Sequence, residues 1–231
     1  KAFRAIPHSR ARFLTGHSSG GWSSLWLQVT YPTLFGGTWS TAPDPVDFRD
    51  FQQINIYEPG NNVYRDKNNQ PRPIARRGGQ PILWFEPFAK MEQVLGPGGQ
   101  LRSFEAVFSP RGADGEPLKL YDRETGAINA QVAEAWQAYD IRLILESNWK
   151  QLAPELAGKI HVFMGEQDTF YLNGATRLLK QALEQLDADA VVEIHQGRDH
   201  SNLLTRDLML RIRAEMVQAF LKYQAEIQPA E

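Results

Sequence analysis

The stretch of this sequence best suited to chemistry is Thr15-Gly16-His17-Ser18-Ser19-Gly20-Gly21, which sets a serine between closely spaced glycines. A short apolar run over residues 11–14 precedes it, and a segment with helical periodicity follows it. Gly-x-Ser-x-Gly in that context is typical of a tight turn between a strand and a helix, with the serine hydroxyl at its apex. We expect Gly16 and Gly20 where a Cβ would collide with the neighbouring strand or helix.

A serine hydroxyl is a weak nucleophile until a base removes its proton, so Ser18 predicts a histidine and a carboxylate further along the chain. In a parallel sheet, functional residues lie just beyond the carboxyl ends of the strands, and this rule selects one residue after each predicted strand: Ser18, Asp44, Asp168 and His200. We predict Ser18 as nucleophile, His200 as general base and then acid, and Asp168 as the group that fixes the histidine tautomer and stabilises the imidazolium. The backbone N–H of Ser19, beside the helix N-terminus, is the predicted oxyanion donor.

The assignments of Ser18 and Asp168 have alternatives. Ser18 could be a plain helix N-cap, although a cap would not require the flanking glycines and the preceding strand. Asp168 could cap the helix that follows it, in which case Asp44 or Asp47, after the neighbouring strand, would supply the acid. The order Ser, Asp, His along the chain favours Asp168.

Other histidines compete with His200 for the role of base. His195 and His161 fall within predicted strands and are expected to point at a packed helix, whereas His200 follows a turn that contains glycine. His17 is adjacent to Ser18 on a rigid turn and cannot easily reach its hydroxyl. We therefore interpret His17 as a packing or hydrogen-bonding residue.

Neither a metal site nor an acidic substrate is well supported. Asp66-Lys67-Asn68-Asn69 lacks the glycine and terminal glutamate of a calcium loop, so a turn is expected there. Arg72, Arg76 and Arg77 could meet an acidic substrate, but such a run more often forms a solvated face.

Strand and helix patterns alternate at both ends of the chain. Strands are predicted at residues 11–15, 35–41, 159–165 and 190–195, and helices at residues 21–31, 175–186 and 204–220. Strands that alternate with helices imply a parallel sheet with right-handed crossovers and helices on its faces. The expected fold class is therefore α/β.

Between these two parts the alternation breaks down, in a stretch rich in Pro, Gly, Asn and Asp. A loop region this long is typical of a lid or binding element, so we expect an insertion over the active site. The predicted organisation is a first core segment at 1–43, an insertion or lid at 44–155 and a second core segment at 156–231. The insertion should end in a helix from about Asn129, with Val132, Trp136, Tyr139 and Leu143 along one face.

Aromatic residues concentrate in this predicted insertion. Two clusters, Trp84-Phe85 with Phe88 and Phe104 with Phe108, are expected to give it a small core of its own. The alternative is that some of them wall an acyl or aryl pocket.

Composition narrows the class of protein. The chain has 231 residues, 42% of them hydrophobic and 23% charged, as in soluble globular proteins. A formal charge of −2 gives no electrostatic reason to expect nucleic acid as partner. No apolar run approaches the roughly 20 residues that span a bilayer. The absence of cysteine excludes a disulfide, a thiolate nucleophile and a cysteine-ligated zinc.

Four stretches together resemble the α/β-hydrolase superfamily, and most closely its esterase branch, which includes esterase D-like and feruloyl esterase-like enzymes. They are Gly16-His17-Ser18-Ser19-Gly20-Gly21-Trp22, the strand end Trp39-Ser40-Thr41-Ala42-Pro43-Asp44-Pro45, Gly165-Glu166-Gln167-Asp168-Thr169-Phe170, and Gly197-Arg198-Asp199-His200. The resemblance covers roughly residues 10–43 and 158–226. It implies a parallel sheet of the α/β-hydrolase type and a serine hydrolase that cleaves small carboxylic esters without metal or organic cofactor.

Two rival functions remain open. A serine peptidase of the same fold would use the same turn, since Gly-x-Ser-x-Gly-Gly also occurs in oligopeptidases. A binding module that keeps the fold without turnover is the other rival.

The chain begins at Lys1, and we expect it to be cut from something longer, so that a signal peptide could have been lost. Only about fifteen residues precede Ser18. The second oxyanion donor of this superfamily comes from an earlier strand, so it is expected upstream of Lys1.

Overall fold

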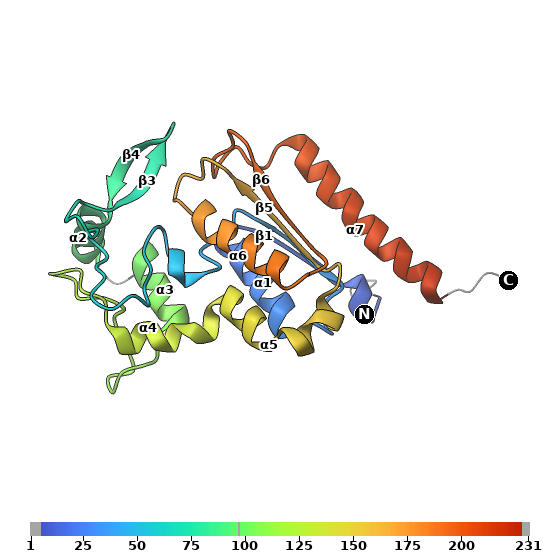
Figure 1. Ribbon diagram of the computed structural model, residues 1–231, viewed down its shortest axis with the longest axis horizontal. Coiled ribbons are helices and arrows are strands. Elements are labelled where there is room, and N and C mark those ends of the chain that lie inside the picture. Colours follow the sequence, from blue (N-terminus) through green and yellow to red (C-terminus); the bar gives the residue numbers. More distant parts are fainter. Residues whose placement is uncertain (1–5, 97, 228–231) are drawn as a thin grey trace.

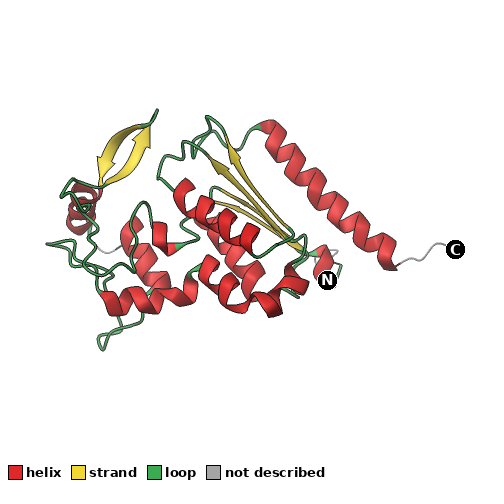
Figure 2. Cartoon of the chain, in the orientation of Figure 1, coloured by secondary structure: helices red, strands yellow, loops and turns green. Residues whose placement is uncertain are grey.

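The computed structural model describes residues 6–96 and 98–227. It contains a central sheet of four parallel strands, whose place among the helices is seen in Figures 1 and 2. In spatial order these are β1 (Phe13–His17), β2 (Gly37–Thr41), β5 (Ile160–Gly165) and β6 (Ala190–His195). All three neighbouring pairs run parallel, as the alternation of strands and helices predicts. The fourth strand has the predicted bounds, and the others begin one or two residues later than expected.

Helices cover both faces of this sheet (Figure 1). On one face lie α1 (Ser19–Thr30), α5 (Ile141–Leu156) and α6 (Asn173–Gln185), and α7 (Arg206–Ile227) packs on the other. Successive residues of β5 point to opposite faces. Val162 belongs to the hydrophobic cluster shared with α1 and α6, whereas Phe163 belongs to the cluster beneath α7. The α/β class is therefore confirmed, with three layers.

The apolar stripe of α1 fixes how this helix enters the core. Trp22, Leu25 and Val29 recur at helical spacing and are buried. Trp26 is partly buried and stacks on Trp22 at 6.1 Å between ring centroids. Because the stripe holds α1 against the sheet, its first residue lies directly beside the end of β1.

The region 44–155 has more regular structure than its composition predicts. A two-stranded antiparallel hairpin, β3 (Pro73–Arg77) and β4 (Gln80–Trp84), lies apart from the main sheet (Figure 2). Three helices follow: α2 (Phe85–Leu95), α3 (Gln100–Phe108) and α4 (Ala130–Trp136). Single turns of 3-10 helix occur at Ser9–Ala11, Phe48–Asp50 and Gln137–Tyr139.

The helix predicted from about Asn129 is interrupted. Asn129 does cap α4, because its side chain accepts from the amides of Gln131 and Val132, but α4 ends at Trp136. Asp140 then starts a separate helix, α5, by accepting from the backbone N–H of Leu143. Since an N-cap has non-helical backbone angles, the chain changes direction there. The single helix predicted across this boundary is therefore wrong.

The aromatic residues of region 44–155 do not form a core of their own. Phe108 packs 5.0 Å from Trp136 and 4.9 Å from Trp22 of α1, measured between ring centroids. Both tryptophans belong to the same hydrophobic cluster as Leu25 and Val162. Trp84, expected in the separate core, is 39% exposed. The aromatic residues of the region therefore share one core with α1 and the sheet.

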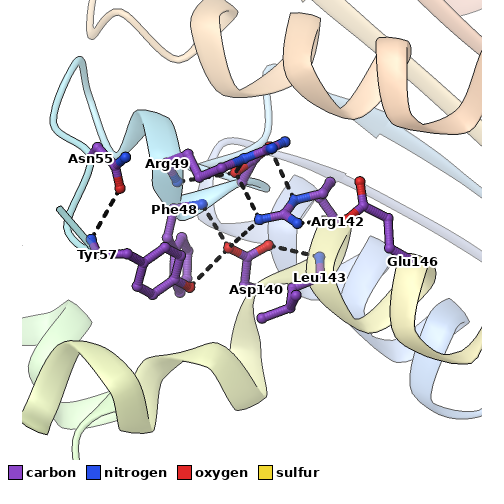
Figure 3. A network of polar contacts seen from close by, with 9 residues as sticks. Phe48, Arg49, Asn55, Tyr57, Asp140, Arg142, Leu143 and Glu146 are labelled. Atoms are coloured by element: carbon purple, nitrogen blue, oxygen red, sulfur yellow. Dashed lines mark hydrogen bonds and ion pairs between the residues drawn. The ribbon is translucent and has the colours of Figure 1, made fainter. Parts of the chain in front are cut away.

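Buried charges also anchor this region (Figure 3). Asp140 accepts hydrogen bonds from the Phe48 amide and the Tyr57 hydroxyl, both at 2.9 Å. Asp47, which is fully buried, pairs with Arg49 and, at 3.2 Å, with Arg142. A buried carboxylate needs such partners to offset its lost hydration. Asp47 is thus engaged in anchoring α5 and does not lie against His200.

Candidate active site

Ser18 occupies a strained turn between β1 and α1. Its backbone angles are φ 58° and ψ −125°, a conformation that is uncommon for any residue with a side chain. The Ser18 amide donates to the carbonyl of Thr41 on β2 at 3.0 Å, which ties the turn to the next strand. Strain of this kind persists where the surrounding structure fixes it and concentrates at functional sites.

The glycines around Ser18 do not all serve the purpose predicted for them. A Cβ on Gly16 would collide with the carbonyl of Gly20, so Gly16 is required. Gly20 itself faces open space, and the expectation for it is wrong. Gly21 carries the constraint instead, because a Cβ there would meet the Thr41 carbonyl oxygen at 2.8 Å. The first turn of α1 passes that close to the end of β2.

Asp168 and His200 form a hydrogen-bonded pair. The Nδ1 atom of His200 lies 2.8 Å from Oδ2 of Asp168, which is fully buried. The other carboxylate oxygen accepts the backbone N–H groups of Phe170 and Leu172, at 2.9 and 3.2 Å. Asp168 therefore organises the turn before α6, as a cap would, and also orients the imidazole.

Adjacent strand ends bring this pair together. The amide of Glu166, after β5, donates to the His195 carbonyl at the end of β6 at 2.9 Å. The amide of Gln167 donates to the Arg198 carbonyl at 2.8 Å. A Cβ on Gly165 would lie 2.5 Å from that same carbonyl oxygen, so this crossing requires a glycine.

His200 lies beside the serine turn. Its ring centroid is 4.8 Å from that of His17, the residue before Ser18, and 5.0 Å from that of Phe170. His17 Nδ1 contacts Thr41 Oγ1 at 3.0 Å. The pKa of His17 is lowered, mainly by burial and secondly by the nearby His200. His17 thus packs and hydrogen-bonds at the site, as its position on the turn predicts.

The hydroxyl of Ser18 is directed at Asp44. It donates to Asp44 Oδ1 across a long 3.4 Å, while the Ser19 hydroxyl donates to Oδ2 at 2.6 Å. Among the described residues, Ser18 makes no hydrogen bond to His200. Asp44 is 6% exposed, and burial raises its pKa against the opposing effects of the Ser19 hydroxyl and His200. The alternative acid is therefore placed against the two serines, whereas Asp168 is placed against the imidazole.

The remaining histidines in strands lie elsewhere. His161 stacks on Trp39 at 4.5 Å between ring centroids and lies 3.8 Å from Glu215 of α7. His195 Nε2 lies 3.4 Å from Glu193. As expected, His161 faces a packed helix.

A cavity of about 260 Å³ opens beside Ser18, and we call it the serine cavity. Its lining combines four polar residues with six apolar ones: Ser18, Asp44, Gln52, Ile74, Leu83, Phe88, Gln100, Phe104, Phe170 and Leu172. Most of the apolar wall comes from the hairpin, α2 and α3. Of the predicted aromatic clusters, Phe88 and Phe104 therefore do border a pocket at the serine.

The acidic turn and two of the arginines have structural roles. Asp66 accepts the backbone N–H groups of Asn68 and Gln70, both at 2.8 Å, so the segment is a turn as predicted. Arg72 donates to the carbonyls of Asn62, Arg65 and Gln53. Arg76 likewise donates to backbone carbonyls, so a solvated face is the wrong description of both.

In residues 6–96 and 98–227, no group of three or more His, Asp or Glu side chains could hold a metal ion. Over the same residues no helix is long and apolar enough to cross a membrane.

Sequence reasoning missed the part that two residues play near Asp168. Gln52 has φ 51° and donates from Nε2 to the Phe170 carbonyl at 3.2 Å, and its Oε1 is buried without a partner. Arg76 donates to the Asp168 carbonyl at 2.9 Å. Gln52 lies outside any helix or strand, and Arg76 lies on the hairpin, apart from the parallel sheet to which the strand-end rule applies, so spacing carries no signal for the role of either.

A parallel sheet whose first strand runs through a strained Gly-x-Ser-x-Gly turn into a buried helix defines the α/β-hydrolase fold. Within that fold, the chain belongs to the Putative esterase family, whose model matches residues 2–209. No curated protein matches the sequence.

Several solved structures are similar to this chain. A carboxylesterase structure from the thaumarchaeon Nitrososphaera gargenis shares 16% identity at a TM-score of 0.41, covering 91% of this chain and 65% of that one. The structure of the monoacylglycerol lipase of Paleococcus ferrophilus shares 15% sequence identity at a TM-score of 0.36, covering 90% of this chain and 67% of that one. The structure of E-2-(acetamidomethylene)succinate hydrolase shares 17% sequence identity at a TM-score of 0.32, covering 89% of this chain and 66% of that one. The chain thus spans 65–67% of their lengths, and scores this low indicate nothing about substrate.

Proposed function

We propose that this chain is a serine hydrolase that cleaves carboxylic esters through an acyl-serine intermediate. The observation that carries the proposal is the 2.8 Å contact between His200 Nδ1 and Asp168, at the same sheet edge as the strained turn of Ser18. Because Nδ1 is held by the carboxylate, Nε2 of His200 is the atom left for proton transfer.

In the first half of the reaction, Ser18 Oγ attacks the ester carbonyl carbon as its proton passes to Nε2 of His200. The tetrahedral intermediate then expels the alcohol, which takes that proton, and leaves an acyl group on Oγ. In the second half, water gives a proton to Nε2 and attacks the acyl carbon. The second tetrahedral intermediate then breaks its bond to Oγ, which takes the proton back from Nε2, so that the carboxylic acid and the Ser18 hydroxyl are released. The Ser18 hydroxyl must first turn from Asp44 towards His200, a rotation about χ1.

The start of α1 supports the charge that develops on the carbonyl oxygen. Ser19 is the first residue of the helix, so its backbone N–H has no partner within the helix. The N-terminal end of a helix also carries partial positive charge. The Ser19 amide therefore serves as an oxyanion donor in this proposal.

The serine cavity favours an apolar acid or alcohol group on the substrate. Its six apolar side chains leave few partners for a highly polar group, and about 260 Å³ approaches the lower end of ordinary ligand pockets. Esters of aromatic or branched acids or alcohols fit this lining.

A fluorophosphonate probe tests the nucleophile directly. We expect the wild-type chain to be labelled and Ser18→Ala to remain unlabelled, with hydrolysis of an aryl ester reduced by at least about 10³-fold. Ser23→Ala is the matched control, because its exposed hydroxyl lies on the same helix and donates only to the Ser19 carbonyl. Labelling that persists in Ser18→Ala, or no labelling of folded wild type, rejects the proposal.

Comparison of substrates separates the esterase from a peptidase. Aryl esters and aminoacyl amides of matched acyl groups should be assayed with the same chain. We expect turnover of the esters alone, and faster turnover of the amides would assign the chain to the peptidases.

A further inference from the structure

The side chain of Arg76, on strand β3 of the hairpin, reaches the loop that carries Asp168. We call residues 166–172 the acid loop. Arg76 Nε donates to the carbonyl of Asp168 at 2.9 Å, and Nη2 donates to the carbonyl of Glu166 at 3.2 Å and to Oδ1 of Asn173 at 3.1 Å. One guanidinium thus joins the first residue of this loop, Asp168 within it and the first residue of α6, which follows it.

Two further contacts fix the hairpin to the acid loop. The backbone N–H of Arg76 donates to the Thr169 carbonyl at 2.8 Å. The guanidinium carbon lies 4.7 Å from the centroid of the Tyr171 ring, a cation–π distance. Tyr171 has φ 60°, in the left-handed region that residues with a Cβ rarely adopt. The loop therefore holds a conformation that it would not prefer alone.

The carbonyl that Arg76 binds belongs to the same residue as the carboxylate that meets His200. Displacement of the Asp168 backbone would move that carboxylate away from Nδ1. The side chain could not turn to compensate, because its other oxygen is already held by the amides of Phe170 and Leu172. A planar guanidinium meets several acceptors in fixed directions, which an ammonium does not.

We infer that Arg76 is a positioning residue, which holds the acid loop so that Asp168 orients His200. The catalytic consequence of this inference rests on the proposed function, since it takes the Asp168–His200 pair to be part of the reacting centre. The same hairpin contributes Ile74 and Leu83 to the serine cavity. The hairpin therefore both walls the cavity and supports the catalytic acid.

The role differs from binding an acidic substrate, which the run of arginines also suggests. The donors of Arg76 are directed at three acceptors within the protein. Arg77, its exposed neighbour, makes none of these contacts and offers a matched control.

Proton NMR of the full chain tests the positioning directly. A proton on Nδ1 shared with a buried carboxylate resonates far downfield, and its loss in Asp168→Asn assigns it. We expect this resonance in wild type and in Arg77→Ala, and its loss in Arg76→Ala. Arg76→Lys should also lose it, because one ammonium cannot meet three separated acceptors. This second variant gives the answer if Arg76→Ala does not fold.

Kinetics supply the second measurement. We expect Arg76→Ala to lower kcat by about 10²-fold, as small displacements of catalytic groups do, with KM unchanged. Guanidinium added to the assay should restore part of kcat in Arg76→Ala and none in Arg77→Ala. A purely structural loss would instead lower the fraction of folded protein, measured by thermal unfolding, and leave the kcat of the folded fraction intact.

The outcomes separate the two proposals. If folded Arg76→Ala or Arg76→Lys retains the downfield resonance and the kcat of Arg77→Ala, the positioning role is overturned. If the resonance depends on Arg76 while the wild-type chain hydrolyses no ester, the positioning role stands and the proposed function is the one rejected.

Discussion

The four-stranded sheet and the region 44–155 are built on different principles. In the sheet, each strand pairs in parallel with its neighbour, and apolar side chains alternate between two helical layers. In the region 44–155, short elements are joined by aromatic contacts and buried ion pairs such as Arg123–Glu105. In the sheet, hydrogen bonds between neighbouring strands determine where each strand ends. In the region 44–155, contacts between side chains determine where the elements lie.

The candidate site divides along the same line. Ser18, Asp168 and His200 all lie on turns that follow sheet strands. Most of the serine cavity wall, and the arginine behind the acid loop, come from the region 44–155. In the proposed enzyme the sheet supplies the reacting groups, and the other region supplies selectivity and support.

Removing the carboxylate from the sheet edge should give the largest effect. We expect Asp168→Asn to lower kcat for an aryl ester by about 10⁴-fold, because an amide donor at Nδ1 favours the wrong tautomer of His200. Steady-state kinetics of the purified variant give the value. Asp44→Asn is the matched comparison at the next strand end, and a greater loss there than in Asp168→Asn would move the acid to Asp44.

The sheet and the candidate residues at its edge could be predicted because they follow local rules. Apolar runs marked the four strands, and Trp22, Leu25 and Val29 marked α1. The strand-end rule selected Ser18, Asp44, Asp168 and His200, and the order Ser, Asp, His favoured Asp168 over Asp44. Gly20 shows the limit of prediction from the turn motif. Which glycine must lack a Cβ depends on how closely α1 approaches β2.

The region 44–155 resisted prediction because its helices bury charge. In α3 the buried residues are Leu101, Phe104, Glu105 and Phe108, so a carboxylate occupies part of the inward face. Its partner Arg123 is distant in sequence. A hydrophobic pattern cannot reveal a buried charge whose partner is unknown, and the same reasoning applies to Arg76.

Breaking that pair tests whether packing alone holds the region. Glu105 accepts from the Leu120 amide at 2.8 Å as well as from Arg123. We expect Glu105→Gln to lower the free energy of unfolding by about 3 kcal/mol, because it leaves a buried guanidinium without its counter-charge. Urea titration measures the change, with the exposed Glu124→Gln as control. Equal stability of the two variants would show that the pair contributes little.

A smaller change should appear when the wall of the serine cavity is cut back. Phe88→Ala enlarges the cavity without touching Ser18 or His200. We expect kcat/KM for a bulky aryl ester to change by about 10-fold relative to an acetyl ester, or about 1.4 kcal/mol, as for a modest loss of apolar contact. Fluorophosphonate labelling of Ser18 should continue. Phe220→Ala on α7, outside the cavity lining, controls for general loss of packing. An equal change in the kcat/KM ratio in Phe220→Ala would show that Phe88 does not act through the cavity wall.

The smallest effect concerns Asp44, where the two regions meet. Burial raises the pKa of its carboxyl, so the folded chain binds this proton more tightly than the unfolded chain does. The stabilisation from the protonated carboxyl is present below the ordinary pKa of aspartate and is lost as the pH rises through the raised value. At neutral pH, Asp44→Asn removes a buried charge and should raise Tm by about 2–4 °C, the shift that 1 kcal/mol produces in a domain of this size. Calorimetry at neutral and acidic pH checks this, because the gain in Tm should shrink as the wild-type carboxyl becomes protonated.

A gain in Tm that is independent of pH would mean that the side-chain amide packs better and that charge is not the cause. A loss of Tm at neutral pH would mean that the hydrogen bonds from Ser18 and Ser19 outweigh the burial of the charge.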